Sequence, residues 1–276
     1  TGGDRIHKEP ESSKSYGHRL WSGGKKMSGE HVRHRVSLEL ELWDDFSDRP
    51  LSDPSIEIIA DGTIRPIRKA DGFYVFVNCL LPLHVEIRSE QYETEEFDAG
   101  IQGEEAVIIK KRLRPGKNYP IPDGTTCIEG TLHPGIRIGA AVKDTASALR
   151  LFADYDPDAD AAHLELFDPA GKNPEGKYFY IEDSSGDHSE IFRAVGYERT
   201  DKRLRIEPEL QHAYKKAGTK VYEYRYTEVR RDGTFFLPLK VRSQGKKVIC
   251  QIRTAEKDFC RKIEPGIVNR IDFDEK

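Results

Sequence analysis

The chain has 276 residues, with 44 Lys and Arg against 48 Asp and Glu, so its formal net charge at neutral pH is −4. This length is enough for one large domain or two of ordinary size, and 12 Phe, 12 Tyr and 2 Trp exclude wholesale disorder. The near balance of charge gives no global field that favours nucleic acid. No stretch approaches the roughly 20 apolar residues of a membrane-spanning helix. We therefore expect neither a nucleic acid partner nor a membrane span.

Residues 1–34 are poor in aliphatic side chains and contain several pairs of Gly or Ser. Such a segment buries too little apolar surface to offset the entropy lost on ordering, which predicts a flexible N-terminal arm. A metal site is not expected there, because no Cys accompanies its histidines and their spacing is irregular. The histidines in or beside the arm are His7, His18, His31 and His34.

Alternation of apolar and polar residues begins abruptly after residue 34. The first run, residues 36–42, has the period of two that is typical of a strand with one buried face. Several short apolar runs separated by Asp-Gly turns predict a β-sandwich over residues 35–111. A stiff, proline-rich linker is expected over residues 112–123. The apolar runs are residues 36–42, 56–59, 73–77, 85–87 and 106–109.

The second half of the chain repeats features of the first half. Residues 68–76, which contain the Asp71-Gly72 turn and an aromatic strand, have a counterpart in residues 230–237, and residues 84–88 match residues 248–253. One unit used twice predicts two related sandwiches, not a solenoid. The second copy is longer between its first strand and its Asp-Gly turn, which indicates an insertion in a surface loop.

The expected fold class is therefore all-β, with two β-sandwich domains of related topology, the second interrupted by a small β-barrel insertion. The second sandwich is expected from residues 124–145 together with residues 228–276. Residues 146–227 form the insertion, and their short alternating runs predict a barrel of five or six strands.

The duplicated halves resemble the carboxypeptidase regulatory-like, or transthyretin-like, β-sandwich, and the second half carries the stronger match. The insertion is similar to small β modules of phage-tail and contractile-injection-system proteins. The resemblance implies a structural fold and supplies no catalytic residues. The sandwich match rests on Gly130, on Gly139-Ala140-Ala141-Val142, on Asp232-Gly233-Thr234-Phe235-Phe236-Leu237 and on Glu264-Pro265-Gly266. The module match rests on Gly176, Ile181, Glu190-Ile191, Leu210, His212-Ala213, Gly218-Thr219 and Val221.

An acidic loop in the insertion has the spacing of a calcium site. Its acids fall at positions 1, 3, 5, 7 and 12 of an EF-hand-like loop, which supplies oxygen ligands to Ca²⁺. Pro157 at position 4 and Ala159 at position 6, where Gly is needed, weaken the match, and so does the strand-like sequence that follows. A solvated acidic loop is the alternative, and Ca²⁺ is the one cofactor we consider. The acids are Asp154, Asp156, Asp158, Asp160 and Glu165.

Five tyrosines of the insertion alternate along two expected strands, so each set points to one face of its strand. If that face is outward, the rings could stack on sugars or dock a protein partner. The alternative is that they line the core of the barrel. These candidate binding residues are Tyr178, Tyr180, Tyr222, Tyr224 and Tyr226.

Other patterns favour ordinary structural roles. Residues 185–190 hold Ser, His and Asp in one turn, but a nucleophilic triad converges from separate elements. His212 is expected to be a packed or hydrogen-bonded structural residue. The four cysteines are expected to be mostly buried, reduced thiols, with a bridge between Cys250 and Cys260 left open. They are Cys79, Cys127, Cys250 and Cys260.

Taken together, the sequence predicts a non-enzymatic structural or adaptor protein that contacts other proteins in a larger assembly, such as a phage-tail-like or contractile-injection particle. A carbohydrate-binding accessory or cell-surface adhesion protein that uses the tyrosines is the alternative, and a Ca²⁺-stabilised adhesin is a third. The expected partners are proteins, or a glycan under the alternative. A cytoplasmic or particle location is expected in preference to secretion.

Overall fold

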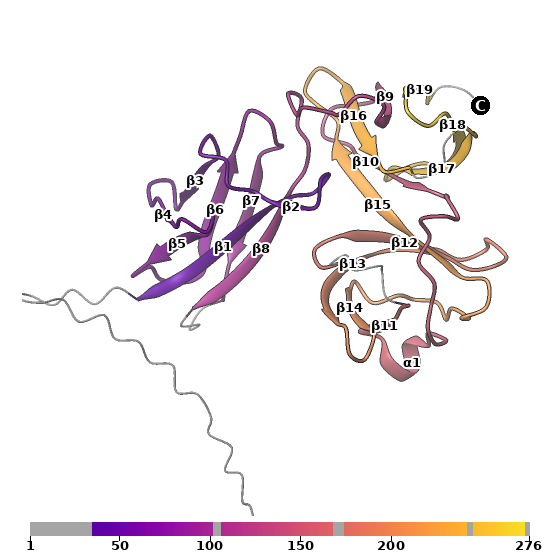
Figure 1. Cartoon of the computed structure of the whole chain (residues 1–276), viewed down its shortest axis with the longest axis horizontal. Helices are drawn as coiled ribbons and strands as arrows, with labels where there is room; N and C mark the ends of the chain where they lie inside the picture. The colour runs from indigo at the N-terminus through magenta and orange to yellow at the C-terminus, as the bar shows by residue number, and fades with distance from the viewer. Residues whose placement is uncertain (1–34, 102–105, 168–173, 242–244, 274–276) are drawn as a thin grey trace, which may run out of the picture. The chain divides into compact units, whose positions relative to one another are not determined.

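The computed structural model describes residues 35–101, 106–167, 174–241 and 245–273. The expected arm, residues 1–34, lies outside these residues. Nearly all regular structure in the described part is β-strand, and α1 (Pro157–Asp160) is a single helical turn. The prediction of an all-β fold is confirmed (Figure 1). No helix in these ranges has the length and apolar character needed to cross a bilayer.

Residues 36–113 form two sheets. β1 lies inside the larger sheet, where it pairs antiparallel with β2 and β5 and parallel with β8. The five strands of this sheet are β1 (Val36–Asp44), β2 (Arg49–Pro50), β4 (Ile67–Arg68), β5 (Tyr74–Val77) and β8 (Val107–Leu113). The three strands of the smaller sheet are β3 (Glu57–Ala60), β6 (Leu83–Arg88) and β7 (Glu95–Ala99).

The inner faces of these two sheets share one apolar core. The period of two in β1 places Leu38, Leu40 and Leu42 on the buried face, and none of them is exposed to solvent. Their packing against aromatic and aliphatic residues of both sheets confirms the alternation expected from the sequence. We call this cluster the first core; it includes Leu38, Leu40, Leu42, Ile58, Tyr74, Phe76, Leu83, Val85, Ile87 and Leu113.

Two further sheets are built from residues 126–271. The larger one has the order β11-β14-β13-β12-β15-β10-β17-β18, and the smaller one has the order β16-β9-β19. The strands of the larger sheet are β10 (Arg137–Val142), β11 (His163–Glu165), β12 (Tyr178–Glu182), β13 (Ser189–Glu198), β14 (Arg203–Glu207), β15 (Lys220–Glu228), β17 (Val248–Arg253) and β18 (Asp258–Ile263). The strands of the smaller sheet are β9 (Thr126–Thr131), β16 (Thr234–Leu239) and β19 (Val268–Ile271).

β15 connects the strands of the expected insertion to those of the expected second sandwich. Tyr224 lies opposite Tyr178 of β12 on one side and opposite Ala141 of β10 on the other. Figure 1 shows β15 in orange between these two strands. The described strands of the insertion thus continue the eight-stranded sheet, and the pairing path among them does not close into a ring. The domain boundaries expected from the sequence stay a prediction.

Two apolar clusters lie along this sheet. One joins β10 and β17 to the smaller sheet, through residues such as Ala140, Ile252 and Phe235. The other is formed by the insertion, through residues such as Phe192 and Leu204. The register places Ala140 and Phe179 on the same side of the sheet as Arg225 and Glu223, their respective partners on β15. Charged side chains of β15 therefore lie between two apolar clusters.

The expected Asp-Gly turn before β16 is present. Gly233 has φ +80°, a conformation that L-residues with a Cβ rarely adopt, and its N–H donates to the carbonyl of Arg230 at 2.9 Å. This turn feeds Phe235 into the core as expected, because Phe235 is almost fully buried.

The cysteines are all free. Cys127 and Cys250 are buried in strands as expected, whereas Cys260 is exposed and Cys79 lies outside the strands. Gln251 lies opposite Cys260, and Cys250 lies opposite Arg261, so Cys250 and Cys260 point to opposite faces of the sheet. The bridge that the sequence left open is therefore absent.

Candidate functional site

The pairing of β15 with β12 ends at Tyr224, and among the described strands none pairs with the following residues of β15 on that edge. Along this edge, polar groups of residues 36–113 form hydrogen bonds with side chains of β15. The guanidinium of Arg225 donates to the carbonyl oxygen of Asp45, in the turn after β1, at 2.6 Å. The hydroxyl of Thr227 donates to Oε1 of Glu93 at 2.5 Å. The free edge of β15 is thus the place where the two halves of the described chain meet.

Arg225 lies at the centre of this contact. Its side chain is 5% exposed, and its Nη1 lies 3.2 Å from Oδ2 of Asp45. Its Nη2 donates to Oε1 of Glu223, two residues earlier on the same face of β15, at 2.8 Å. Burial disfavours the charge, but the carboxylates of Asp45 and Glu223 raise the pKa of Arg225 above its ordinary value. Arg225 is therefore a buried, fully ionised cation.

Asp48 collects three more cations beside Arg225. Its carboxylate accepts from Nζ of Lys177 at 2.7 Å, Nζ of Lys240 at 2.8 Å and Nη1 of Arg112 at 2.9 Å. We call the whole group the junction; it comprises Asp45, Asp48, Arg112, Lys177, Glu223, Arg225 and Lys240.

The cations keep the acids of the junction ionised. Burial alone would raise the pKa of Glu223, but Arg225, Lys177 and Lys240 outweigh burial and lower it to about 2. In the same way, Lys177 and Lys240 overcome burial at Asp48 and hold its pKa below the ordinary value. Buried ion pairs contribute little net stability compared with apolar packing, but they penalise any arrangement that separates them. The junction is suited to fixing a geometry.

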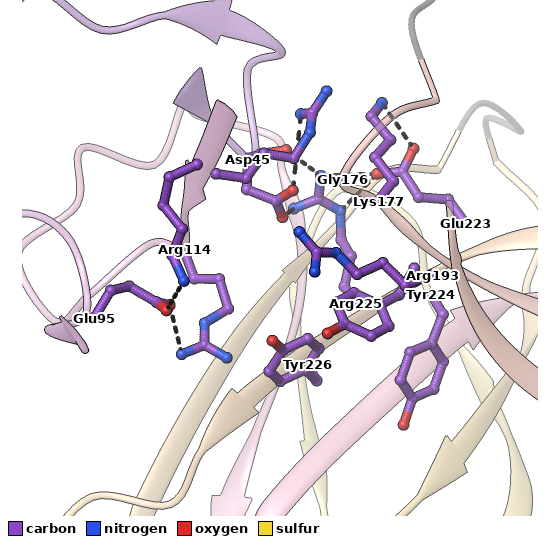
Figure 2. A pocket seen from close by; sticks show the side chains of 13 residues that line it. Asp45, Glu95, Arg114, Gly176, Lys177, Arg193, Glu223, Tyr224, Arg225 and Tyr226 are labelled. Carbon is purple, nitrogen blue, oxygen red and sulfur yellow. Dashed lines mark hydrogen bonds and ion pairs between the residues drawn. The ribbon is translucent and has the colours of Figure 1, made fainter. Parts of the chain in front are cut away.

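A cavity of about 100 Å³ lies next to the junction. It opens where β12 begins, and Figure 2 shows its lining side chains. Residues from both halves of the described chain line it, namely Asp45, Glu95, Lys111, Arg112, Arg114, Gly176, Lys177, Tyr178, Arg193, Glu223, Tyr224, Arg225 and Tyr226.

The five tyrosines predicted as binding residues form one row on the face of the sheet opposite Glu223 and Arg225. Tyr178 lies opposite Tyr224, and Tyr180 lies opposite Tyr222. The ring of Tyr226 meets that of Tyr178 edge to face, with centroids 5.1 Å apart. The structure therefore brings all five together, on the face that points away from the apolar cluster of the insertion.

Cationic side chains and neighbouring rings cover much of this row. Tyr180, Tyr222 and Tyr224 are buried, and Tyr178 and Tyr226 are partly buried. The guanidinium groups of Arg114 and Arg137 lie 4.4 and 4.6 Å from the ring centroid of Tyr226. Such a row presents no continuous, open platform of the kind that stacks on a sugar. Glycan binding by the tyrosines stays a prediction from the sequence.

The sheet can hold these rings because of a glycine on the neighbouring strand. A Cβ placed on Gly139 would collide with the hydroxyl oxygen of Tyr224, well inside van der Waals contact. The Tyr224 ring therefore occupies the space above Gly139. Burial raises the pKa of Tyr224 to about 12, so its hydroxyl stays protonated at neutral pH.

The acids of the predicted calcium loop are engaged separately. Oδ1 of Asp154 accepts from the backbone N–H of Lys216 at 2.7 Å, and Asp156 caps α1 by accepting from the N–H of Asp158 at 3.0 Å. Asp160 is paired with His163 at 2.9 Å, while Glu165 lies at the end of β11. Among the residues with a described placement, no three His, Cys, Asp or Glu side chains are grouped to hold a metal. The calcium site stays a prediction that rests on spacing alone.

The remaining sequence candidates have structural contacts. Nδ1 of His212 lies 3.0 Å from Oε1 of Glu190, and the backbone N–H of His212 donates to the same oxygen at 3.0 Å, which confirms a hydrogen-bonded role. The ring of His188 stacks on that of His212, with centroids 4.3 Å apart. The hydroxyl of Ser185 donates to Asp183 at 3.0 Å. Ser185 and His188 thus have separate partners.

Sequence reasoning missed the junction. One signal was available: β15 alternates tyrosines with Val221, Glu223, Arg225 and Thr227. Glu223 and Arg225 occupy positions of the strand that should face a core. A charge at such a position indicates a buried partner of opposite charge, because an unpaired buried charge is costly. Asp45, the partner of Arg225, lies 180 residues away in the sequence, so no local pattern could identify it.

Comparisons with known proteins add little. No family model and no curated protein matches the sequence. Among solved structures, a mutant form of the shaft pilin SpaA of Lactobacillus rhamnosus GG is similar over 87% of this chain and 96% of that chain, at 8% identity and a TM-score of 0.16. A TM-score this low carries no argument about fold or function.

Proposed function

We propose that this chain is a structural protein that acts through contacts with other proteins. The observation that carries the proposal is a row of side chains across the outer face of the five-stranded sheet. Ile67 of β4 lies opposite Val75 of β5, Val75 lies opposite Glu39 of β1, and Glu39 lies opposite Ile108 of β8. Ile67 is 49% exposed and Ile108 is 73% exposed, whereas Val75 between them is 4% exposed. We call Ile67, Val75 and Ile108 the apolar row.

The apolar row has no role in the first core. The period of two places Leu38 and Leu40 on the opposite face of β1 from Glu39. Polar residues are the usual choice on a solvated outer face of an antiparallel sheet. The exposed apolar side chains here are those of Ile67 and Ile108, which stand at the two ends of the row with the buried Val75 and with Glu39 between them. Exposed apolar surface on a sheet is a feature of sites that another protein covers. The charged pair of Lys110 with Glu41, 4.0 Å apart, lies next to the row and would form part of a polar rim.

The junction supports the same proposal. Buried charges that must stay paired hold residues 36–113 against β15 in one arrangement. A component that links partners at a fixed spacing needs such rigidity more than it needs extra stability. Membership in a phage-tail-like or contractile-injection particle, with a cytoplasmic or particle location and no enzymatic activity, is the finer form of the proposal. It rests on the sequence resemblance.

The test is to change the apolar row without changing the core. Ile108→Glu places a charge in the row, and Leu80→Glu makes the same change at an isolated site that is 90% exposed. Tagged chains are expressed in the native cells, and their partners are quantified by mass spectrometry. We expect Ile108→Glu to reduce partner recovery at least about tenfold, since burying a charge unpaired costs several kcal/mol, and Leu80→Glu to leave it unchanged.

Two results would overturn the proposal. One is equal partner recovery with Ile108→Glu and the unchanged chain. The other is tight binding of a sugar on a glycan array by a chain that recovers no protein partner, which would favour the carbohydrate-binding alternative.

A further inference from the structure

The cavity beside the junction is rich in positive charge. Six of its lining side chains are cationic, against three acids. The acids are already engaged: Asp45 and Glu223 pair with Arg225, and Glu95 pairs with Lys111 and Arg114, each at 2.8 Å. The acids of the lining therefore do not neutralise all of its cations. The cations are Lys111, Arg112, Arg114, Lys177, Arg193 and Arg225.

The cations still outnumber the acids when the charged side chains that pair with the lining residues are also counted. Asp48 and Glu93 add two acids, and Lys240 adds one cation. Among these side chains, seven are cations and five are acids, so the cations remain in excess. Water and salt screen such an excess poorly in a partly buried site. A bound anion would relieve it.

Arg193 is the cation that is available to that anion. It lies on β13 opposite Tyr178, and its side chain is half-buried. No hydrogen bond or ion pair joins its guanidinium to any residue of the described ranges. This includes Glu207, which lies opposite Arg193 on the neighbouring strand β14. In Figure 2 the side chain extends toward the middle of the labelled group. A half-buried Arg without a partner is unusual, because burying a guanidinium requires compensation.

The size and lining of the cavity limit the ligand. Its volume of about 100 Å³ is room for roughly three water molecules, and so for one small oxyanion. The rings of Tyr178 and Tyr226 border it. Burial raises the pKa of Tyr226, so its hydroxyl is a proton donor at neutral pH. Guanidinium groups and hydroxyls together match the oxygen atoms of a tetrahedral anion.

We propose that this cavity binds an oxyanion of the phosphate class, and that the guanidinium of Arg193 is its principal new partner. The excess of cations around the cavity and the hydroxyl donors beside them favour an anion that carries several oxygen atoms and more than one negative charge. The anion is either free phosphate or a phosphate group that projects from a larger molecule. The proposal is independent of the protein-contact role, because the apolar row lies on the outer face of a different sheet.

The test is calorimetric titration of the full chain with inorganic phosphate, at a pH where phosphate is dianionic and at constant ionic strength. Arg193→Gln removes the charge, and Arg205→Gln is the matched control, on the neighbouring strand β14 and outside the cavity lining. We expect Arg193→Gln to weaken phosphate binding at least about tenfold, Arg193→Lys to have an intermediate effect, and Arg205→Gln to change it by less than about twofold.

Phosphoserine in place of phosphate distinguishes the two sources: tighter binding of phosphoserine assigns a carried phosphate group, and tighter binding of inorganic phosphate assigns the free ion. Thermal melting in phosphate-free buffer checks that each variant is folded. Failure to detect binding up to about 10 mM phosphate, or equal affinity of the unchanged chain and a folded Arg193→Gln, would overturn the site.

Discussion

The first core and the junction are both buried, yet they are built from opposite chemistry. The first core consists of Leu38, Leu40, Leu42 and similar apolar side chains from two sheets. The junction buries the guanidinium of Arg225 beside partly exposed acids at the free edge of β15. An apolar core stabilises in proportion to the area it buries and tolerates many packings. Paired buried charges contribute little net stability but accept few arrangements. The comparison indicates that stability and geometry are supplied by different regions.

The largest effect is expected from breaking the junction. Arg225→Ala would leave Asp45 and Glu223 without their shared cation, at a cost of about 3–5 kcal/mol of unfolding free energy. Urea denaturation measures this loss of unfolding free energy. Arg65→Ala is the control, since it breaks an exposed pair with Glu57, 2.9 Å apart, for less than about 1 kcal/mol. Equal effects of the two substitutions would show that the junction is not a buried network.

A cavity in the first core should have the next largest effect. Leu40→Ala removes a fully buried side chain from β1, and we expect a loss of about 3 kcal/mol in urea denaturation. Val268→Ala, at a site that is 48% exposed, should cost less than about 1 kcal/mol. A loss below about 1 kcal/mol for Leu40→Ala would contradict the packing of the first core.

Acid should weaken the junction and leave the first core unaffected. The pKa of Glu223 is lowered to about 2, below its value in the unfolded chain. Its stabilising contribution, roughly 3 kcal/mol, is therefore fully present above about pH 5 and is lost as pH falls toward 2. Stability measured against pH should fall across that window, and the fall should be smaller in Glu223→Gln. An unchanged pH dependence in this variant would argue against an ionised Glu223.

A smaller effect is expected where the tyrosine row meets β10. Gly139→Ala would place a methyl group against the Tyr224 ring, and the displacement should cost about 1–3 kcal/mol. In a Tyr224→Ala background the same substitution should cost much less, because the ring is gone. Additive losses in the double variant, measured by thermal melting, would show that the two residues do not share this space.

The smallest effect on stability is expected at the apolar row. Ile108→Glu changes a side chain that is 73% exposed, so unfolding free energy should change by less than about 0.5 kcal/mol. A larger loss would mean that Ile108 contributes to folding, and the row would then have a structural explanation.

The sequence predicted what depends on local patterns. The alternation in residues 36–42 and the turn at Gly233 correctly indicated a one-sided strand and a tight turn, because side-chain period and positive φ are properties of a few adjacent residues. The shared use of β15 by two groups of strands, by contrast, depends on pairings between distant segments. No local period encodes such a partner.

The candidate sites could likewise be predicted only as far as local sequence patterns reach. Alternation placed the five tyrosines on common faces, but it could not reveal that Arg114 and Arg137 lie over the ring of Tyr226. Spacing selected the acidic loop, yet Asp154 and Asp160 are taken by different neighbours in the fold. Arg193 carried no sequence signal, since its significance lies in having no partner among the described residues inside a charged cavity.

The most direct test of the protein-contact role is site-specific photo-crosslinking in the native cells. A photoreactive amino acid is placed at position 108, in the apolar row, and separately at position 80, which is more exposed and lies outside the row. If the apolar row contacts a protein, position 108 gives a discrete crosslinked adduct, with another copy of the chain or with a second protein, and position 80 gives none. Indistinguishable crosslinking from the two positions would contradict the protein-contact role.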